Sequence, residues 1–555
     1  MRRALQLTAL SIVLAGVLSS AFGCGDEPIP RTSPSDVGSD PRGDADGPAP
    51  SVEAPEAGVP DAPSVVRYDV PCGSDEVYFP EEATELHWNI SCASALEAPA
   101  QLPEGASFDS ASSTISWTPR LDQAGPFEIV LSDGTSQTRI SGTVLDRFDA
   151  PGNVPLVDPT QYLEEHGLPV IHLTWHSEDS MYCRDAVARD SVPADIIVGG
   201  RAHSGAELRC RGETSLAFPK KSFTLKFTKD DPFHAPPSLA AFEGRRRLIL
   251  TQTFDDVSQI RTRLAFELWN RLDPENVRID QASAIVFIDG EYQGLYQVTD
   301  DVGDHLMATR GLDKNGNMFK SKAHSGNYRT TLNNGTPKED LTVGYEKKEG
   351  EPADDFGDLI TLLKWASDSS IDEIESTIDS VLRTEDFLDW YILATALIAY
   401  DNFAKNSQVY IDSNGPDRRF RYIPWDLNAT FGQAWNRAKV SAFDLGRGST
   451  LPSTYNGIWQ RIVESPTLLA RLEARYAAAL EGPMSRAATL DLFDEMSAEV
   501  RPSALRDDRR WNDERKRYPL WSALESDATF DTERASMRSW IEQRWSYLTP
   551  LYVSP

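Results

Sequence analysis

The fold depends most on two polar stretches of the chain, DNFAKN at residues 401–406 and PWDLN at residues 424–428. An almost entirely apolar run, Phe387 to Tyr400, precedes the first stretch and predicts a buried helix that is too short to span a bilayer. Apolar segments at 407–411 and 420–423 flank a polar turn, which is typical of a β-hairpin. One helix and one hairpin therefore deliver both polar stretches.

Three oxygen-bearing side chains in these stretches have a spacing that suits phosphoryl transfer. Asp401 and Asn406 stand five positions apart, and Asp426 follows the hairpin. Protein kinases use an Asp near the substrate hydroxyl, an Asn five residues later that binds Mg²⁺, and an Asp after the next hairpin that binds the phosphate-bridging metal. Asp and Asn after a helix more often form caps and turns, so spacing alone leaves a structural role open.

The chain around these stretches predicts an α+β domain from about residue 150 onward. The strand 222–227 alternates, with Phe223 and Leu225 on one face and Ser222 and Thr224 on the other. The patterns predict strands at 170–175 and 208–211, a helix at 258–272, a hairpin at 284–298 around Asp289-Gly290, and helices within 456–548 with Ser465-Pro466 as a cap and first turn.

Several segments, in order, resemble the signature blocks of the spore-coat protein H (CotH) kinase family. The resemblance covers most of 150–550 and implies an atypical protein-kinase-like fold, ATP, Mg²⁺ or Mn²⁺, and phosphorylation of extracytoplasmic or coat proteins. The matching segments are RGETS (211–215), FPKKSFTLKF (218–227), IR (260–261), DGEYQGLY (289–296), Asp401 with Asn406, and PWDLNATFG (424–432).

The resemblance also implies roles for the oxygen-bearing residues. Asp401 would be the catalytic carboxylate, and Asp426 would hold the metal with Asn406 beside it. Asn428 stands where the family usually has a second metal-binding Asp, so that ligand brings an oxygen without a charge. Asp300 stands where the family usually has Glu after the hairpin. Both departures leave room for weakened activity.

Nucleotide binding is expected of a strand lysine and of a nearby arginine. Lys221 or Lys226 would meet the ATP phosphates, and the two lie on opposite faces of the strand, which leaves the choice between them open. Arg211 in the RGETS segment is a further candidate for phosphate contact.

The N-terminal part of the chain predicts export. Residues 1–24 resemble a bacterial lipoprotein signal peptide in which Cys24 is lipidated, although an ordinary secretory peptide remains the alternative. Residues 25–66 are rich in Pro, Asp, Gly and Ser and predict a disordered tether. Residues 67–148 are strand-like and resemble the immunoglobulin-like modules of bacterial surface proteins, a small β-sandwich. The kinase-like domain is placed at 150–550.

Four further cysteines fall as two close pairs, which in an oxidising compartment predicts two local disulfides. These are Cys72 with Cys92, and Cys183 with Cys210.

Composition narrows the possible partners. The 555 residues carry a net charge of −30, which argues against a broad nucleic-acid surface. The expected partner is a protein substrate at the cell envelope, reached at the outer membrane or cell surface, with the membrane contacted only through the lipid anchor. The alternative is a catalytically weak or inactive surface protein that keeps the kinase-like fold for binding or for a structural role.

Overall fold

We describe the protein from a computed structural model. It describes residues 65–78, 80–120, 123, 125–144, 159–160, 162–176, 190–212, 214–518 and 528–553. Cys24, Cys183 and nearly all of the expected tether lie outside these residues, so those predictions stand as made. Within the described ranges, no helix is both long and apolar enough to cross a membrane.

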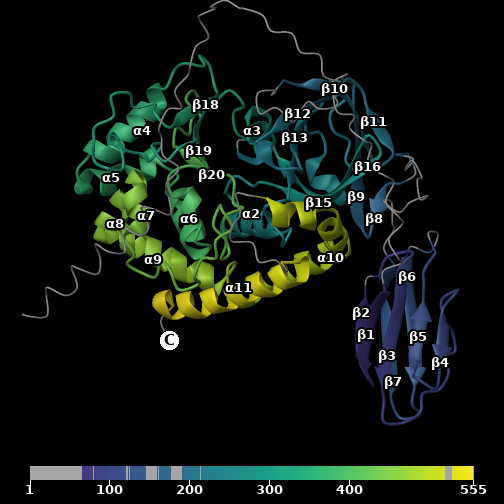
Figure 1. The fold of residues 1–555 in the computed structure, drawn as a ribbon. Coiled ribbons are helices and arrows are strands. Elements are labelled where there is room, and N and C mark those ends of the chain that lie inside the picture. Colours follow the sequence, from purple (N-terminus) through teal and green to yellow (C-terminus); the bar gives the residue numbers. More distant parts are fainter. Residues whose placement is uncertain are drawn as a thin grey trace, which may run out of the picture. The chain divides into compact units, whose positions relative to one another are not determined.

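The N-terminal described region is built only of strands (Figure 1). One sheet has the order β1-β3-β5-β4 and the other β2-β7-β6, and inward residues such as Trp88, Trp117 and Ile129 form a common core. The strands are β1 (Val65–Pro71), β2 (Asp75–Tyr78), β3 (Glu85–Ser91), β4 (Ser107–Asp109), β5 (Thr114–Trp117), β6 (Gly125–Ser132) and β7 (Gln137–Val144). This region is β-rich as expected, while its kinship with immunoglobulin-like modules remains a prediction.

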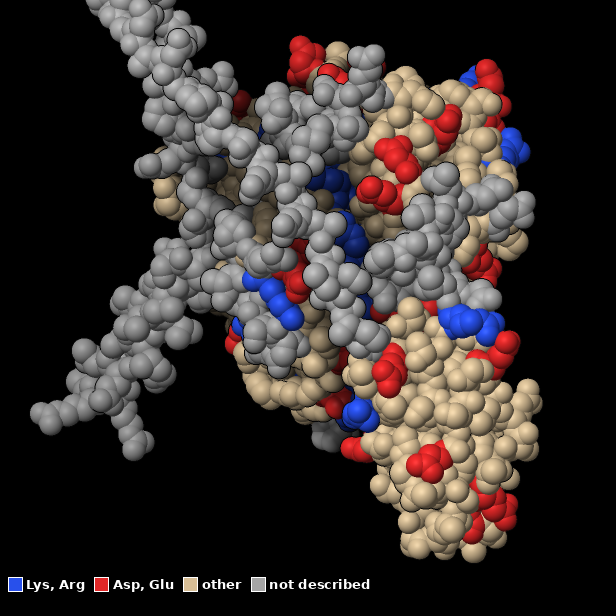
Figure 2. Space-filling model, turned by 45° about the vertical axis from the view of Figure 1, so that its right-hand side comes forward, with Lys and Arg blue, Asp and Glu red and all other residues tan. Residues whose placement is uncertain are grey.

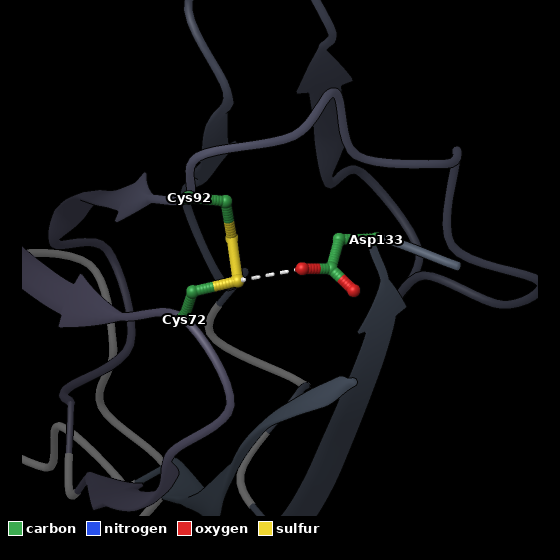
Figure 3. Close-up of side chains that lie close together, drawn as sticks. All are labelled: Cys72, Cys92 and Asp133. Atoms are coloured by element: carbon green, nitrogen blue, oxygen red, sulfur yellow. Dashed lines mark hydrogen bonds between the residues drawn. A yellow bond between two sulfur atoms is a disulfide. The ribbon is translucent and has the colours of Figure 1, made fainter. Parts of the chain in front are cut away.

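A disulfide joins the end of β1 to the end of β3, as the cysteine spacing predicts. Cys72 and Cys92 are bonded, and a carboxylate oxygen of Asp133 lies 3.5 Å from the sulfur of Cys72 (Figure 3). Both sulfurs are used by the disulfide, so this group offers no thiolate to a metal. Cys210 is also disulfide-bonded.

A nine-stranded sheet forms the first half of the large α+β region. Because β10 pairs with β9 as well as with β11 and β12, seven of its strands (β9, β10, β12, β13, β14, β16 and β15) close into a ring. The sheet order is β11 (Arg201–His203), β10 (Val192–Val198), β12 (Glu207–Arg211), β13 (Ser222–Lys226), β14 (Arg247–Gln252), β16 (Glu291–Asp300), β15 (Gln281–Ile288), β9 (Leu168–Trp175) and β8 (Glu164–Glu165).

The alternation predicted for β13 is confirmed by this packing. Phe223, Leu225 and Phe227 belong to the core shared by the strands of the ring. The predicted hairpin is also confirmed as β15 and β16, with Asp289 in the left-handed region at its turn.

The second half combines a four-stranded sheet with helices. The sheet has the order β18 (Tyr345–Glu349), β17 (Asn317–Ser321), β19 (Ser407–Ile411) and β20 (Arg421–Pro424). The helices are α2 (Arg261–Leu272), α3 (Asp304–Thr309), α4 (Gly357–Asp368), α5 (Ile371–Val381), α6 (Thr384–Ala396), α7 (Leu451–Tyr455), α8 (Gly457–Glu464), α9 (Pro466–Glu481), α10 (Arg486–Arg517) and α11 (Phe530–Tyr552). Ser465 caps α9 through its hydroxyl, with Pro466 in the first turn, as predicted.

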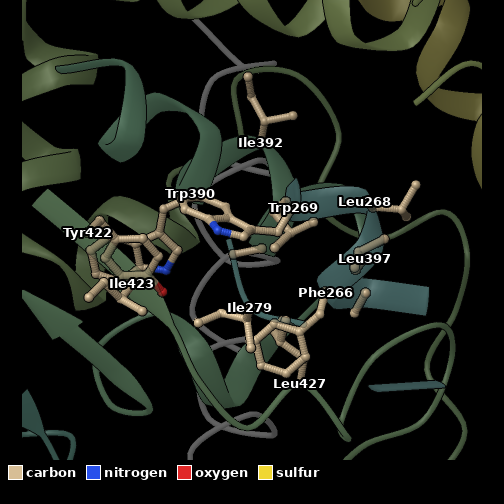
Figure 4. Close-up of a cluster of buried hydrophobic side chains, with 14 of the residues drawn as sticks. Phe266, Leu268, Trp269, Ile279, Trp390, Ile392, Leu397, Tyr422, Ile423 and Leu427 are labelled. Atoms are coloured by element: carbon tan, nitrogen blue, oxygen red, sulfur yellow. The ribbon is translucent and has the colours of Figure 1, made fainter. Parts of the chain in front are cut away.

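Helix α6 is buried on all sides and anchors the hairpin that follows it. Trp390 of α6 stacks on Tyr422 of β20 with ring centres 3.9 Å apart, and Trp269 of α2 meets the same Tyr422 edge-on (Figure 4). Aromatic pairs of this kind add to the free energy gained by burial. The helix and the hairpin are therefore packed as one unit, which fixes the two polar stretches relative to each other.

The acidic balance of the chain is visible on the described surface. On the face in Figure 2, Asp and Glu side chains are scattered among uncharged residues rather than gathered in one patch.

Candidate functional site

Asp401 lies where helix α6 gives way to a short 3-10 turn, Tyr400–Asn402. The α-helix ends at Ala396, four residues before the expected end, and the chain bends through Ile398, whose φ of 54° is unusual for a β-branched residue. The carboxylate accepts a hydrogen bond from Nδ2 of Asn406 at 2.8 Å and forms an ion pair with Nζ of Lys405 at 2.9 Å. The predicted pair of Asp401 and Asn406 is thus in direct contact.

The loop that carries Asp426 is tied to the loop that carries Asp401. The backbone NH of Trp425 donates to the carbonyl of Asn406 at 3.2 Å. The buried side chain of Asn402 donates to the carbonyls of Trp425 at 2.7 Å and of Asn406 at 3.3 Å. The two loops are therefore held side by side by backbone contacts, independently of any ligand.

Asp426 has a perturbed carboxyl group. Its residue surface is exposed, yet protein crowds the carboxyl enough that desolvation, followed by the charges of Asp401 and Asp255, raises its pKa to about 6. Lys320 and Lys405 oppose this shift. Its φ of 55° is left-handed, a conformation that non-glycine residues adopt mainly at special positions. Mutual charge effects of this kind require that the groups lie near one another.

Asp255 is a site residue that the sequence did not reveal. It is buried in the loop after β14, and its Oδ2 accepts a 2.6 Å hydrogen bond from Nδ2 of Asn428. Burial raises its pKa, and the hydrogen bond from Asn428 opposes that shift. The segment FDDVSQIR at 254–261 ends with the IR block, and this closeness to the block was the only indication in the sequence.

Arg261, in that IR block, joins the Asp255 loop to the loop after Asp426. Its fully buried guanidinium donates to the carbonyls of Thr430 and Phe431, both at 2.9 Å, and pairs with Glu533 of α11 at 2.6 Å. Its backbone NH is bound by Asp256. This arginine holds the two loops in register.

Arg544 of α11 holds the end of the helix that leads to Asp401. Its buried guanidinium donates to the carbonyls of Thr395 at 2.7 Å and Ala396 at 3.0 Å, at the C-terminal end of α6. A cation at this end satisfies carbonyls that the helix leaves unpaired. The end of α6 that leads to Asp401 is thereby fixed.

Two cations approach Asp426 from different sheets. Arg211, at the end of β12, lies with its guanidinium carbon 5.2 Å from the ring centre of Trp425. Lys320 lies on β17 directly opposite Gln408 of β19. Desolvation lowers the pKa of both cations, and the charge of Asp426 opposes that shift in each case. Lys320 was not expected from the sequence.

The comparisons with known proteins agree with this architecture. The model of the family described as CotH kinase protein matches residues 208–548. The chain belongs to the CotH kinase family. It is also similar to the inner spore coat protein H of Bacillus subtilis (strain 168), with 24% identity over 393 residues that cover 69% of this chain and 97% of that protein. Membership of the CotH family suggests a kinase-like function.

The other predicted nucleotide residues of the CotH domain lie in different surroundings. Lys221 donates to the carbonyl of Leu216 at 2.6 Å. Lys226 of β13 lies opposite Glu207 of β12, and its ammonium is 3.5 Å from the Glu207 carboxylate. Arg211 lies at the other end of this strand pair, opposite Ser222. The structure therefore brings Arg211 toward Asp426 and leaves Lys226 at the far end of the same strand pair.

The neighbouring Lys220 is buried in an ionic network. Its ammonium contacts Asp507 of α10 and donates to the carbonyl of Leu295 at 2.7 Å. Asp507 in turn accepts from Arg515 at 2.5 Å and from Gln259 at 2.9 Å. This network joins the last part of α10 to the closed sheet.

Asp300, the other departure from the family pattern, also lies in a buried ionic cluster. Its carboxylate accepts from Arg245 at 2.7 Å and from Arg310 at 2.9 Å. These ion pairs indicate that Asp300 stabilises the end of β16.

The donor set around Asp426 fits a hard divalent cation. Carboxylate oxygens of Asp426 and amide oxygens of Asn406 and Asn428 are ligand types that Mg²⁺ prefers. Among the described residues, three His, Cys, Asp or Glu ligand atoms come within 4.8 Å of one another only at the Cys72–Cys92 disulfide. Asp401, Asp426 and Asp255 therefore do not form a closed cage of three carboxylates, and a metal here would rely on amide oxygens as well.

Proposed function

We propose that the CotH domain transfers the γ-phosphoryl group of ATP to a hydroxyl group of an extracytoplasmic or surface protein. The observation that supports this most is the fixed pair of loops that sets Asp401, with Asn406 bonded to it, beside Asp426. This is the arrangement of residue types that phosphoryl transfer requires.

In this reaction Asp401 would accept the proton of the attacking hydroxyl. The hydroxyl oxygen forms a bond to the γ-phosphorus, the bond from that phosphorus to the β–γ bridging oxygen breaks, and ADP leaves. Contacts with Asn406 and Lys405 orient the Asp401 carboxylate. Asp426, Asn406 and Asn428 would hold Mg²⁺ or Mn²⁺, which neutralises phosphate charge when bound.

Arg211 and Lys320 are the cations best placed to contact the ATP phosphates. Both lie within the electrostatic reach of Asp426, from two different sheets. In this role they replace the choice between Lys221 and Lys226 that the sequence left open.

The setting proposed for this activity is the cell envelope. The CotH relative that the chain resembles is named a spore coat protein, which supports a surface or coat location. The proposal includes export through the N-terminal segment and lipidation of Cys24. The partner proposed is a protein substrate.

The test is transfer of label from γ-labelled ATP by the full chain with Mg²⁺ or Mn²⁺. Asp401→Asn and Asp426→Asn should each abolish labelling while the chain stays folded, with a melting temperature in EDTA that is not below that of the wild type. Asp417→Asn is a matched control in the exposed hairpin turn, where only an exposed ion pair with Arg419 is lost. Labelling that persists in both site variants would reject the proposal.

A second candidate function is a surface protein that binds without catalysis. The observation in its favour is Asn428, which removes one charge from the expected metal ligands. Nucleotide binding separates the candidates, because a protein that binds neither ATP nor metal cannot be a kinase.

A further inference from the structure

Asp255 makes contacts that determine how the side chain of Asn428 is turned. An ionised carboxylate only accepts hydrogen bonds, so the amide presents its NH₂ group to Asp255, at 2.6 Å. The oxygen and nitrogen of an amide point in different directions, so the oxygen of Asn428 faces away from Asp255. No residue in the described ranges donates a hydrogen bond to that oxygen.

Asp255 is itself held in place by contacts that do not involve Asn428. Its carbonyl accepts from Nε2 of Gln433 at 3.0 Å. The next residue, Asp256, accepts from the backbone NH groups of Ser258 and Arg261, and the side chain of Arg261 reaches Thr430 and Phe431. The loop 253–261 is therefore hydrogen-bonded to the loop 426–433 at several positions, and these bonds hold Asp255 in place beside Asn428.

The pair is also matched as donor and acceptor. An Asp at position 428 would set two carboxylate groups against each other at hydrogen-bond distance, where each group offers acceptor oxygens to the other. Asn428 supplies an NH group at this position, so its contact with Asp255 is a hydrogen bond.

We propose that Asp255 is a positioning residue of the CotH site. It fixes the Asn428 amide with its oxygen turned toward a bound divalent metal. The metal part of this inference rests on the proposed function. A direct consequence is that carboxylate and amide are interchangeable between positions 255 and 428.

The test compares the wild type, Asp255→Asn, Asn428→Asp and the double variant in the full chain. Mn²⁺ binding is measured by electron paramagnetic resonance, and the melting temperature is measured in EDTA. Asp255→Asn should weaken Mn²⁺ binding on the order of ten-fold, as loss of a residue that orients a metal ligand does. Asn428→Asp should lower the melting temperature in EDTA, and the double variant should recover both properties.

The outcomes separate the proposals. Single effects that merely add in the double variant would overturn the pairing, since contacting residues are expected to couple. Unchanged Mn²⁺ binding in Asp255→Asn, or a wild type that binds no Mn²⁺, would overturn the positioning role. If Mn²⁺ binding follows the expected pattern while no label leaves ATP, the positioning role stands and the proposed phosphoryl transfer fails. Asp417→Asn again serves as the control variant.

Discussion

At the scale of single residues, Lys320 and Lys226 offer a matched comparison. Lys320 lies near Asp426, whereas Lys226 pairs with Glu207 at the far end of its strand. Hydrogen bonds to charged groups contribute about 1.5–3 kcal/mol, so Lys320→Met should raise the KM for ATP by about ten-fold or more. Lys226→Met should leave that KM within about two-fold. Steady-state kinetics with varied ATP would check this, and the reverse order would contradict the assignment.

Asp426 gives the site a pH dependence of defined sign. Its pKa of about 6 lies above the usual value, and protons compete with a metal for the carboxylate. Mn²⁺ affinity should be constant well above pH 6 and fall by about ten-fold per pH unit below it. Binding titrations over a pH series would reveal the break. An affinity that rises on acidification would contradict this role.

The raised pKa of Asp426 makes the stability of the fold change with pH in the opposite direction to metal affinity. The pKa of Asp426 is higher in the folded chain than in the unfolded chain. Its contribution to the free energy of unfolding is therefore fully present below the unfolded pKa and is lost as the pH rises through about 6. Asp426→Asn cannot ionise, so it should melt above the wild type in EDTA near neutral pH. The difference should shrink as the pH approaches about 4. A variant that melts lower at neutral pH would show that the ionised carboxylate stabilises the fold.

At the scale of secondary-structure elements, Gly294 of β16 is required by the approach of α10. It has a φ of 90°, and a Cβ there would lie 2.1 Å from Oδ2 of Asp507. Gly294→Ala should disturb the buried contacts of Asp507 with Lys220 and Arg515 and lower the free energy of unfolding by about 3 kcal/mol or more. Gly311→Ala, with φ 74° and nothing within 4 Å of its Cβ, should lose only about 1–2 kcal/mol. Chemical denaturation of both variants would measure the difference, and equal losses would contradict the role of the network.

Elements with regular patterns were predictable, because their periodicity is local. Strand β19 begins and ends where the sequence places it, and β13 buries the expected face. The bend at Ile398 was missed because the apolar run continues through it, and the contacts of Arg544 with the end of α6 come from a helix distant in the sequence. Lys220 and Asp507 are 287 residues apart, so no local pattern could join them.

Only the central residues of the candidate site could be grouped from the sequence. Asp401, Asn406 and Asp426 lie on one helix end and one hairpin, so their spacing carries information. Asp255 and Lys320 come from a loop and a strand that reach the site through the packing of separate elements. A single Asp or Lys in such segments cannot be distinguished from the many others in the chain.

At the scale of the whole molecule, one disulfide cross-links the β-rich N-terminal region. Cys72 and Cys92 close a loop with a sequence separation of 20 residues, and a bond of this kind stabilises a fold by about 3 kcal/mol. Cys72→Ser with Cys92→Ser should lower the melting temperature of this region, as followed by scanning calorimetry. Phosphoryl transfer should be unaffected, because the site residues lie within the CotH match at 208–548. An equal loss of activity would show that the two regions depend on each other.

Left-handed backbone is concentrated where the chemistry is proposed. Ile398, Asn406, Asp426 and Phe431 have φ values of 54°, 56°, 55° and 49°. Ile398 is the most strained of the four, because a β-branched residue rarely adopts such angles, whereas Asn and Asp tolerate them. Asn406→Gly and Asp426→Gly would therefore keep the backbone path at a cost of about 1 kcal/mol while removing the oxygen donors. The backbone at these two positions does not itself require the side chains on which the proposed chemistry rests.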